Sequence, residues 1–338
     1  MAQRVIKIIL PRESEGKVIE ILANTPHLGF WQEESSSRNA IFSILAESGQ
    51  SEAIMDLFEK QFSYVDGFRL ILFPVEASLP RSKKEDKPET QDDPVKNRIN
   101  GLFSRISREE LYADVKEGAV LSGFYILMIF LSTVVVAIGL LKNSVAVIIG
   151  GMVIAPFLGP NVGLALSSCL ADRELAKTAT KSLVVGVFFV MIFSVLMGLL
   201  FEVNTDLPEI ADRTRADLVD IILALAAGSA GVFAFTTGAS SAVIGVMVAV
   251  ALLPPLVVCG LLVGSGFYSG GFGAFVLFLV NVICINLSGV GTFLIQGVTP
   301  RTWWEADRAM RSSKKAVFAW SVTLAVLSII LYFLATNH

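Results

Sequence analysis

The spacing of apolar residues divides the chain into two parts. Residues 4–10 (RVIKIIL) are mainly β-branched and apolar, which predicts a strand, and short apolar runs continue to about residue 75. From residue 119 onward the apolar runs are much longer, and they reach the roughly 20 residues that an α-helix needs to cross a bilayer. The pattern predicts an α-helical polytopic membrane protein with a small N-terminal domain.

Residues 1–78 have the pattern of a small α+β domain. The predicted order is strand, helix, strand, strand, helix, strand, which is the βαββαβ order of a ferredoxin-like fold. These elements are predicted at residues 4–10, 14–24, 28–34, 39–47, 50–63 and 67–75, with a polar turn at Ser35-Ser36-Ser37.

Two segments connect this domain to the membrane part. Residues 79–104 are rich in charge and proline, which predicts a flexible linker. Residues 105–118 predict a juxtamembrane helix, because Ser107 and Glu110 have the spacing of an S-x-x-E capping box.

The transmembrane part, residues 119–338, is predicted to contain seven membrane-spanning helices. They are expected near residues 119–141, 143–168, 182–201, 218–237, 240–264, 273–297 and 316–335. The loops 172–181 and 298–315 are basic, whereas the loop 202–217 is acidic. By the positive-inside rule, this places the N-terminal domain in the cytoplasm and the C-terminus outside, in the cell inner (plasma) membrane.

Composition supports a membrane protein and excludes several functions. The mean hydropathy is +0.67, and residues 221–300 contain no Asp, Glu, Lys, Arg or His. The net charge of −3 argues against a nucleic-acid partner. The three cysteines lie in apolar runs, which is typical of small buried side chains rather than of metal ligands. They are Cys169, Cys259 and Cys284.

An internal repeat is visible at an offset of 95 residues. Residues 143–160 (NSVAVIIGGMVIAPFLGP) resemble residues 239–255 (ASSAVIGVMVAVALLPP), and the offset aligns Ile149 with Ile244 and Pro160 with Pro255. Each copy contains three predicted helices, an odd number, so the second copy must cross the membrane in the opposite direction. The sequence thus predicts a 3+3 inverted repeat, with copies at about 119–201 and 217–297 and an extra helix at 316–335.

Prolines interrupt the matched helices at corresponding points. Proline removes a backbone donor, and freed carbonyls are tolerated in a membrane where they are buried in protein or line a wet cavity. Amides and hydroxyls at membrane depth would add oxygen ligands; the alternative for each of them is interhelical hydrogen bonding. The predicted pathway residues are Pro156, Gly159, Pro160, Asn161, Thr237, Ser241, Pro254, Pro255, Asn281 and Asn286.

The membrane part lacks the residues that catalysis requires. It has no H-E-x-x-H, no G-x-S-x-G and no paired carboxylates, and the two histidines are His27 and His338. We therefore expect no enzyme activity, no catalytic residue, no metal site and no cofactor. A proton relay is also disfavoured, because the predicted helices contain a single carboxylate, Asp220, near an outer end.

With the motif GGMVIAPFLGP at residues 150–160 and its partner VMVAVALLPP, the chain resembles a family of uncharacterised "hydrophobic domain" membrane proteins of bacteria and archaea, a domain-of-unknown-function family. The resemblance covers about residues 115–300. It implies an N-terminal ferredoxin-like region in many members, and it implies neither a substrate nor catalytic residues.

Two functions from different classes follow. The first is transport of a small solute or ion, by a carrier or channel, with a regulatory cytoplasmic domain that binds a small-molecule regulator. The alternative is a membrane-anchored ligand sensor or oligomeric scaffold without transport. In both cases we expect contact with membrane lipid and a homo-oligomer.

Overall fold

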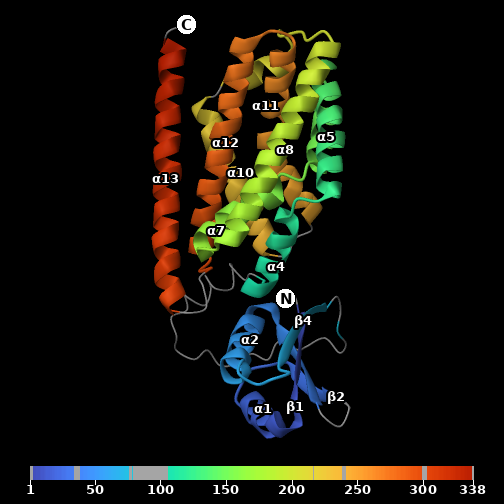
Figure 1. Cartoon of the computed structure of the whole chain (residues 1–338), viewed down its shortest axis with the longest axis vertical. Coiled ribbons are helices and arrows are strands. Elements are labelled where there is room, and N and C mark those ends of the chain that lie inside the picture. Colours follow the sequence, from blue (N-terminus) through green and yellow to red (C-terminus); the bar gives the residue numbers. More distant parts are fainter. Residues whose placement is uncertain are drawn as a thin grey trace. The chain divides into compact units, whose positions relative to one another are not determined.

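The computed structural model describes residues 3–33, 39–75, 78, 106–215, 217–237, 241–298 and 303–336, with side chains outside 218, 241–250, 303–309 and 327–336. The predicted turn at 35–37 and the predicted linker 79–104 lie outside these ranges. The chain divides into two compact units, Met1–Leu111 and Tyr112–His338 (Figure 1).

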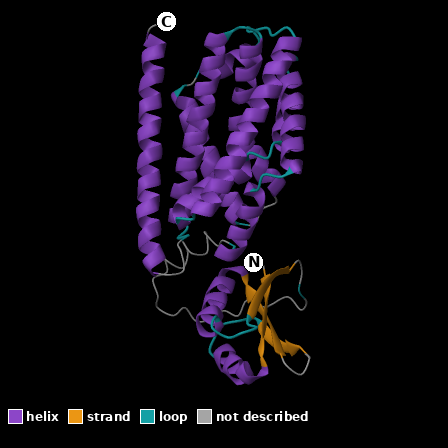
Figure 2. Cartoon of the chain, in the orientation of Figure 1, coloured by secondary structure: helices purple, strands orange, loops and turns teal. Residues whose placement is uncertain are grey.

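The N-terminal unit contains a four-stranded antiparallel sheet and two α-helices (Figure 2). Its strands lie in the order β2-β3-β1-β4, so β1 and β3 occupy the centre. The element order is the predicted strand, helix, strand, strand, helix, strand, with an additional short 3-10 helix at Arg12–Ser14. The elements are β1 (Gln3–Pro11), α1 (Glu15–Ala23), β2 (Gly29–Glu33), β3 (Asn39–Glu47), α2 (Ser48–Phe62) and β4 (Arg69–Val75).

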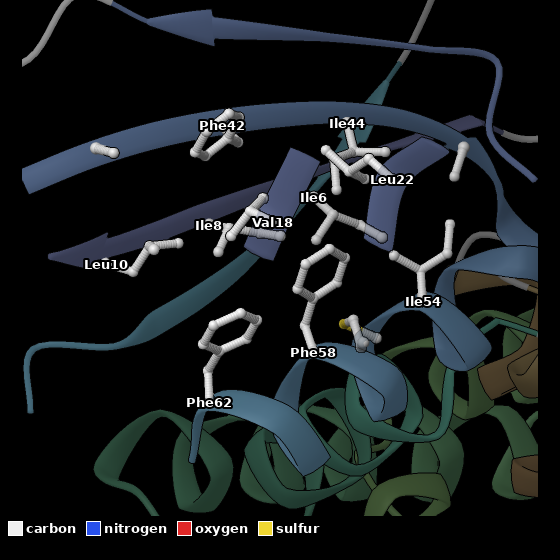
Figure 3. Packing of buried hydrophobic residues seen from close by; sticks show 13 residues of the cluster. Ile6, Ile8, Leu10, Val18, Leu22, Phe42, Ile44, Ile54, Phe58 and Phe62 are labelled. Carbon is white, nitrogen blue, oxygen red and sulfur yellow. The ribbon is translucent and has the colours of Figure 1, made fainter. Parts of the chain in front are cut away.

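The core of this unit follows from the period of two along its central strands. Successive side chains of β1 point to opposite faces, so Ile6, Ile8 and Leu10 are fully buried on one side. They pack with Val18 of α1 and Phe58 of α2, as Figure 3 shows. Both helices therefore cover the same face of the sheet.

Helix α4 (Arg108–Ala119) contains the boundary between the two units. Within the first unit, the Ser107 hydroxyl accepts a hydrogen bond from the backbone N–H of Glu110 at 3.2 Å, as the predicted capping box requires. The Glu110 carboxylate does not complete the box, because it accepts two bonds from the Arg4 guanidinium instead, at 2.8 and 3.0 Å. Half of the predicted motif is thus replaced by an ion pair.

Within the second unit, the same helix is tied to the start of α8 (Arg173–Leu200). The Tyr112 hydroxyl donates to the Asp172 carboxylate at 2.6 Å, and Asp172 also caps α8 by accepting from Glu174 and Leu175 N–H groups. The hydrogen bond to Asp172, together with burial, raises the pKa of Tyr112 to about 12. Burial opposes ionisation of Asp172, but its hydrogen bonds outweigh this effect and lower its pKa.

The second unit is built from α-helices. Among the described residues, α5, α8, residues 219–236 of α10, and α12 are long and apolar enough to cross a membrane, and α6 with α7 form a fifth, bent candidate. These helices are compatible with a membrane protein. Besides α4 and α8, the helices of this unit are α5 (Gly123–Leu141), α6 (Val145–Ile154), α7 (Leu158–Leu170), the short α9 (Pro208–Ala211), α10 (Leu218–Thr236), α11 (Ser241–Gly264), α12 (Tyr268–Ile295) and α13 (Trp303–Thr336).

Two predicted boundaries were wrong. Helix α8 begins at Arg173 rather than at residue 182, because Asp172 supplies an N-cap and the basic residues of the predicted loop lie in its first turns. Helix α12 likewise starts earlier than predicted, at Tyr268. The predicted helix 143–168 is interrupted after Ile154, as its prolines predicted, and its two parts are bent by 55°.

Glycines allow the helices of this unit to approach closely. A Cβ on Gly159 of α7 would lie 2.0 Å from the carbonyl oxygen of Gly118 in α4. A Cβ on Gly264 of α11 would lie 2.3 Å from the carbonyl oxygen of Val195 in α8. Both glycines belong to G-x-x-x-G spacings in the sequence, and both stand where two backbones touch.

We predict that Gly159→Ala destabilises the second unit by about 2 kcal/mol or more, because a methyl group there must separate α4 from α7. Thermal unfolding of the full chain in detergent measures the loss. Gly150→Ala is the matched control, since nothing lies within 4 Å of a Cβ at that position in α6. Equal unfolding temperatures for the two variants would contradict the close contact.

Candidate functional site

The break between α6 and α7 contains four of the predicted pathway residues. Pro156 lies in the break, and Gly159, Pro160 and Asn161 belong to the first turn of α7. Pro160 is the third residue of α7, where a helix leaves the backbone N–H without an intrahelical partner. The missing donor therefore costs little there, and the chain changes direction with its prolines in tolerated positions.

Two predicted asparagines meet beside this break. Asn161 and Asn286 are both fully buried, and the amide nitrogen of Asn286 donates to the side-chain oxygen of Asn161 at 3.0 Å. Asn161 in turn donates to the backbone carbonyl of Phe157 at 2.8 Å. The side-chain oxygen of Asn286 is buried and accepts no hydrogen bond in the described part of the chain. A buried acceptor without a partner is costly, so this oxygen is a candidate ligand for a solute or water.

The prolines of α11 do not break the helix as the sequence predicted, because α11 continues through them from Ser241 to Gly264. Pro254 and Pro255 are buried inside the helix, and a proline at 255 leaves the carbonyl of Ala251, four residues earlier, without its intrahelical donor. The amide nitrogen of Asn281 in α12 donates to that carbonyl at 2.6 Å. A side chain from a neighbouring helix thus replaces the missing backbone N–H. Pro255 and Asn281 were both predicted as pathway residues, but nothing in the sequence indicated that they lie together.

A cavity of about 550 Å³ adjoins Pro255 and Asn281. Ala251, Pro255 and Asn281 line its inner part, and alanines of α10 form much of the wall. Charged residues of the segment before α10 stand at its other end. The complete lining consists of Glu209, Asp212, Arg213, Asp220, Leu223, Ala224, Ala226, Ala227, Ala230, Ala251, Pro255, Leu277 and Asn281.

The cavity extends deep into the helical unit. Asp220 and Ala230 lie ten residues apart on α10, which corresponds to about 15 Å along the helix axis. Asn281 lies near the middle of α12 and is 5% exposed. The cavity therefore joins a charged rim to a polar group at roughly half the depth of a bilayer.

The remaining predicted residues lie elsewhere. Thr237 is exposed at the C-terminal end of α10, where its hydroxyl donates to the carbonyl of Ala234. Ser241 begins α11, and its side chain lies outside the described residues. The structure brings together Asn161 with Asn286, and Pro255 with Asn281.

Sequence reasoning missed the wall and the rim of the cavity. Four alanines of α10 form one side, and an available signal was their clustering at residues 224–230 (ALAAGSA) within an otherwise bulky apolar run. Arg213 and Glu209 at the rim form an ion pair at 2.8 Å. No group of three or more metal-ligating side chains occurs in the part of the chain that the structure describes.

Comparison with known proteins gives two matches. A family model described as "Domain of unknown function (DUF389)" matches residues 152–287. The chain is 37% identical over 290 residues to the Uncharacterized protein MJ0678 of Methanocaldococcus jannaschii, an alignment that covers 86% of this chain and 87% of that protein. No solved structure matches the chain.

We predict that Asn281→Ala costs about 1–3 kcal/mol of stability, because it leaves the buried carbonyl of Ala251 without a donor. The double variant Asn281→Ala/Pro255→Ala should recover much of this loss, since alanine at 255 restores the backbone N–H for the same carbonyl. A double-mutant cycle read by thermal unfolding measures the coupling. Additive effects would show that Asn281 does not act on the proline interruption.

Proposed function

The chain belongs to the DUF389 family, and from this premise we propose that it transports a small solute or ion across the cell inner (plasma) membrane. The observation that carries the proposal is the cavity that reaches from a charged rim to Asn281, beside the helix position where Pro255 removes a backbone donor. Proline-interrupted helices at corresponding points of two repeats are a recurrent position for substrate sites in transporters.

Helix bounds support the inverted repeat on which this proposal depends. Helices α5 and α10 have 19 residues each, and they begin at Gly123 and Leu218. Helices α8 and α12 have 28 residues each, and they begin at Arg173 and Tyr268. Both pairs are offset by the 95 residues that relate the two sequence motifs. Two unrelated three-helix segments would not be expected to share length and spacing in this way.

Contacts between the proposed copies support the repeat independently. A Cβ on Gly260 would lie 1.8 Å from the Ser194 hydroxyl, and one on Gly289 would lie 3.0 Å from the Ala165 side chain. Under the offset, Gly260 corresponds to Ala165 and Ser194 to Gly289. The third helix of each copy thus packs at the same positions on the interrupted helix of the other. A pseudo-two-fold axis between the copies would produce this exchange.

A second exchanged contact involves the carbonyl groups one residue further along. The Cys169 thiol lies 3.7 Å from the carbonyl oxygen of Val290. Its counterpart Gly264 lies against the carbonyl oxygen of Val195, the counterpart of Val290. Position for position, α7 meets α12 as α11 meets α8.

In this proposal the solute passes from the cavity toward the Asn161–Asn286 pair. Asn286 follows Asn281 by five residues, about 7.5 Å along α12. The unpaired oxygen of Asn286 offers a hydrogen-bond acceptor at the next step beyond the cavity. Seven spanning helices, a cytoplasmic N-terminal domain and an external C-terminus remain part of this proposal. The hydrogen bond from Glu209 N–H to the Asn143 side chain supports an outer position for both loops.

The N-terminal unit has the regulatory role in this proposal. The strand order β2-β3-β1-β4 with antiparallel neighbours supports its assignment as ferredoxin-like. An open depression of about 550 Å³, lined by residues that include Lys17, Asn24, Gln61 and Tyr64, offers a place for a small-molecule regulator. The same depression favours the alternative function, a membrane-anchored ligand sensor or oligomeric scaffold without transport. Flux through the purified protein separates the two.

We predict that Asn286→Leu abolishes flux while expression stays intact, because it removes the acceptor beside the helix break and leaves Asn161 without its partner. Stopped-flow light scattering of proteoliposomes under gradients of potassium chloride, glycerol and butylammonium chloride measures flux. Thr323→Leu on the exposed face of α13 is the control, since it makes a similar polar-to-apolar change away from the pair. Equal flux in both variants would count against the pathway, and no flux in any protein would favour the sensor.

A further inference from the structure

We infer that the cavity between α10, α11 and α12 binds a small organic cation, an ammonium ion with an apolar body. This inference rests on the proposed function, because it names the class of solute for the same site. It is carried by the negative charge of the rim, the apolar surface of the wall, the side chain of Asn281 and the comparison with the other copy.

The rim of the cavity carries an excess of negative charge. Four charged residues line it, and the single cation among them, Arg213, is ion-paired with Glu209 at 2.8 Å. Asp212 and Asp220 remain without a basic partner among the lining residues. Both also line an adjoining cavity of about 880 Å³, which adds Asp217 and Arg215. A cation approaching either cavity meets an attractive field, whereas an anion is repelled.

The wall excludes a bare metal ion as the preferred occupant. Alanine, leucine and proline side chains supply most of the surface, and metal cations such as K⁺ or Ca²⁺ require several oxygen ligands at once. Asn281 supplies one side-chain oxygen, because its amide nitrogen is used on the carbonyl of Ala251. This residue is 95% buried and lines the cavity. A hydrocarbon body against the alanines, with its charge toward the aspartates, satisfies both parts of the surface.

The other copy shows that this space is a specific feature. Under the 95-residue offset Asp220 corresponds to Tyr125, which is 4% exposed and donates its hydroxyl hydrogen to the carbonyl of Ser182 at 2.9 Å. The Tyr125 hydroxyl lies 2.5 Å from the Cβ position of Gly186, the counterpart of Asn281. The equivalent place is therefore filled by an aromatic side chain.

The residues of α10 that form the alanine wall are also smaller than their counterparts in the other copy. Ala224, Ala226 and Ala230 correspond to larger residues of α5, which are Ile129, Leu131 and Val135. The second copy has thus lost bulk and gained a carboxylate at the positions that face the cavity. Packing alone requires neither change.

The test is binding of n-butylammonium to the full chain in lipid nanodiscs, measured by isothermal titration calorimetry. We expect saturable binding of n-butylammonium that exceeds binding of neutral pentan-1-ol and of butyrate. Asp220→Asn should weaken n-butylammonium binding roughly tenfold, because it removes a charge at the rim while the asparagine oxygen can still accept the hydrogen bond from the Asp217 N–H. Asp206→Asn, an exposed carboxylate in the same segment, should leave binding unchanged.

A second variant tests the space rather than the charge. Ala226→Leu/Ala230→Val gives α10 the residues that α5 carries at the same positions, and it should abolish n-butylammonium binding without any change of charge. Equal binding of pentan-1-ol and n-butylammonium would overturn the inference in favour of an unspecific apolar cavity. Preference for butyrate, or equal losses for Asp220→Asn and Asp206→Asn, would also overturn it. Since these are binding measurements, they can fail while flux and its loss in Asn286→Leu stand.

Discussion

The second unit depends on how its interrupted helices satisfy their backbone groups. In apolar surroundings a carbonyl that loses its intrahelical donor must find another, and water is available only in cavities. Asn281 provides this donor for Ala251, the carbonyl freed by Pro255. Asn161 supports the break between α6 and α7 through the Phe157 carbonyl, and Asn286 holds Asn161. The polar residues of the membrane part are therefore placed by its prolines.

The asparagines can have both roles that the sequence offered for them, namely interhelical hydrogen bonding and binding of a solute. Read singly, each asparagine makes the interhelical or local hydrogen bond that a structural role requires. The bonds nevertheless leave the buried side-chain oxygen of Asn286 without a donor among the described residues, and Asn281 lines the cavity. A group that holds one helix with its nitrogen and keeps its oxygen free can serve both structure and binding. The same residues then stabilise the interruption and present it to a solute.

Much of the fold could be predicted from periodicity and helix signals. The strand predicted at residues 4–10 and the βαββαβ order of the first unit appear in the structure, and burial alternates along β1 because successive side chains point to opposite faces. The predicted start of α8 was wrong because hydropathy locates only the apolar part of a helix. The Asp172 cap and a polar first turn extend α8 beyond that part, toward its N-terminus. The bend at 55° could be suspected from Pro156 but not measured from it.

The candidate site was predictable in its residues and not in its pairing. Prolines and asparagines stand out in an apolar sequence, but the sequence does not show that Asn281 bonds the Ala251 carbonyl or that Asn286 meets Asn161. Those contacts depend on helix rotation and on close approach at glycines. The alanine wall of α10 could not be predicted from the sequence either, since small residues occur both at tight helix contacts and beside cavities. The bulky counterparts in α5 indicate that the alanines of α10 line open space.

In the proposed arrangement, two copies of one three-helix unit cross the membrane in opposite directions. Lys142 follows α5, and its counterpart Thr237 follows α10, and both are exposed. Single cysteines at these positions, labelled in intact cells and inverted vesicles with a membrane-impermeant maleimide, test the claim directly, since the three native cysteines are buried. The account predicts labelling of Lys142→Cys from outside only and of Thr237→Cys from inside only. Labelling of both from the same side would contradict it.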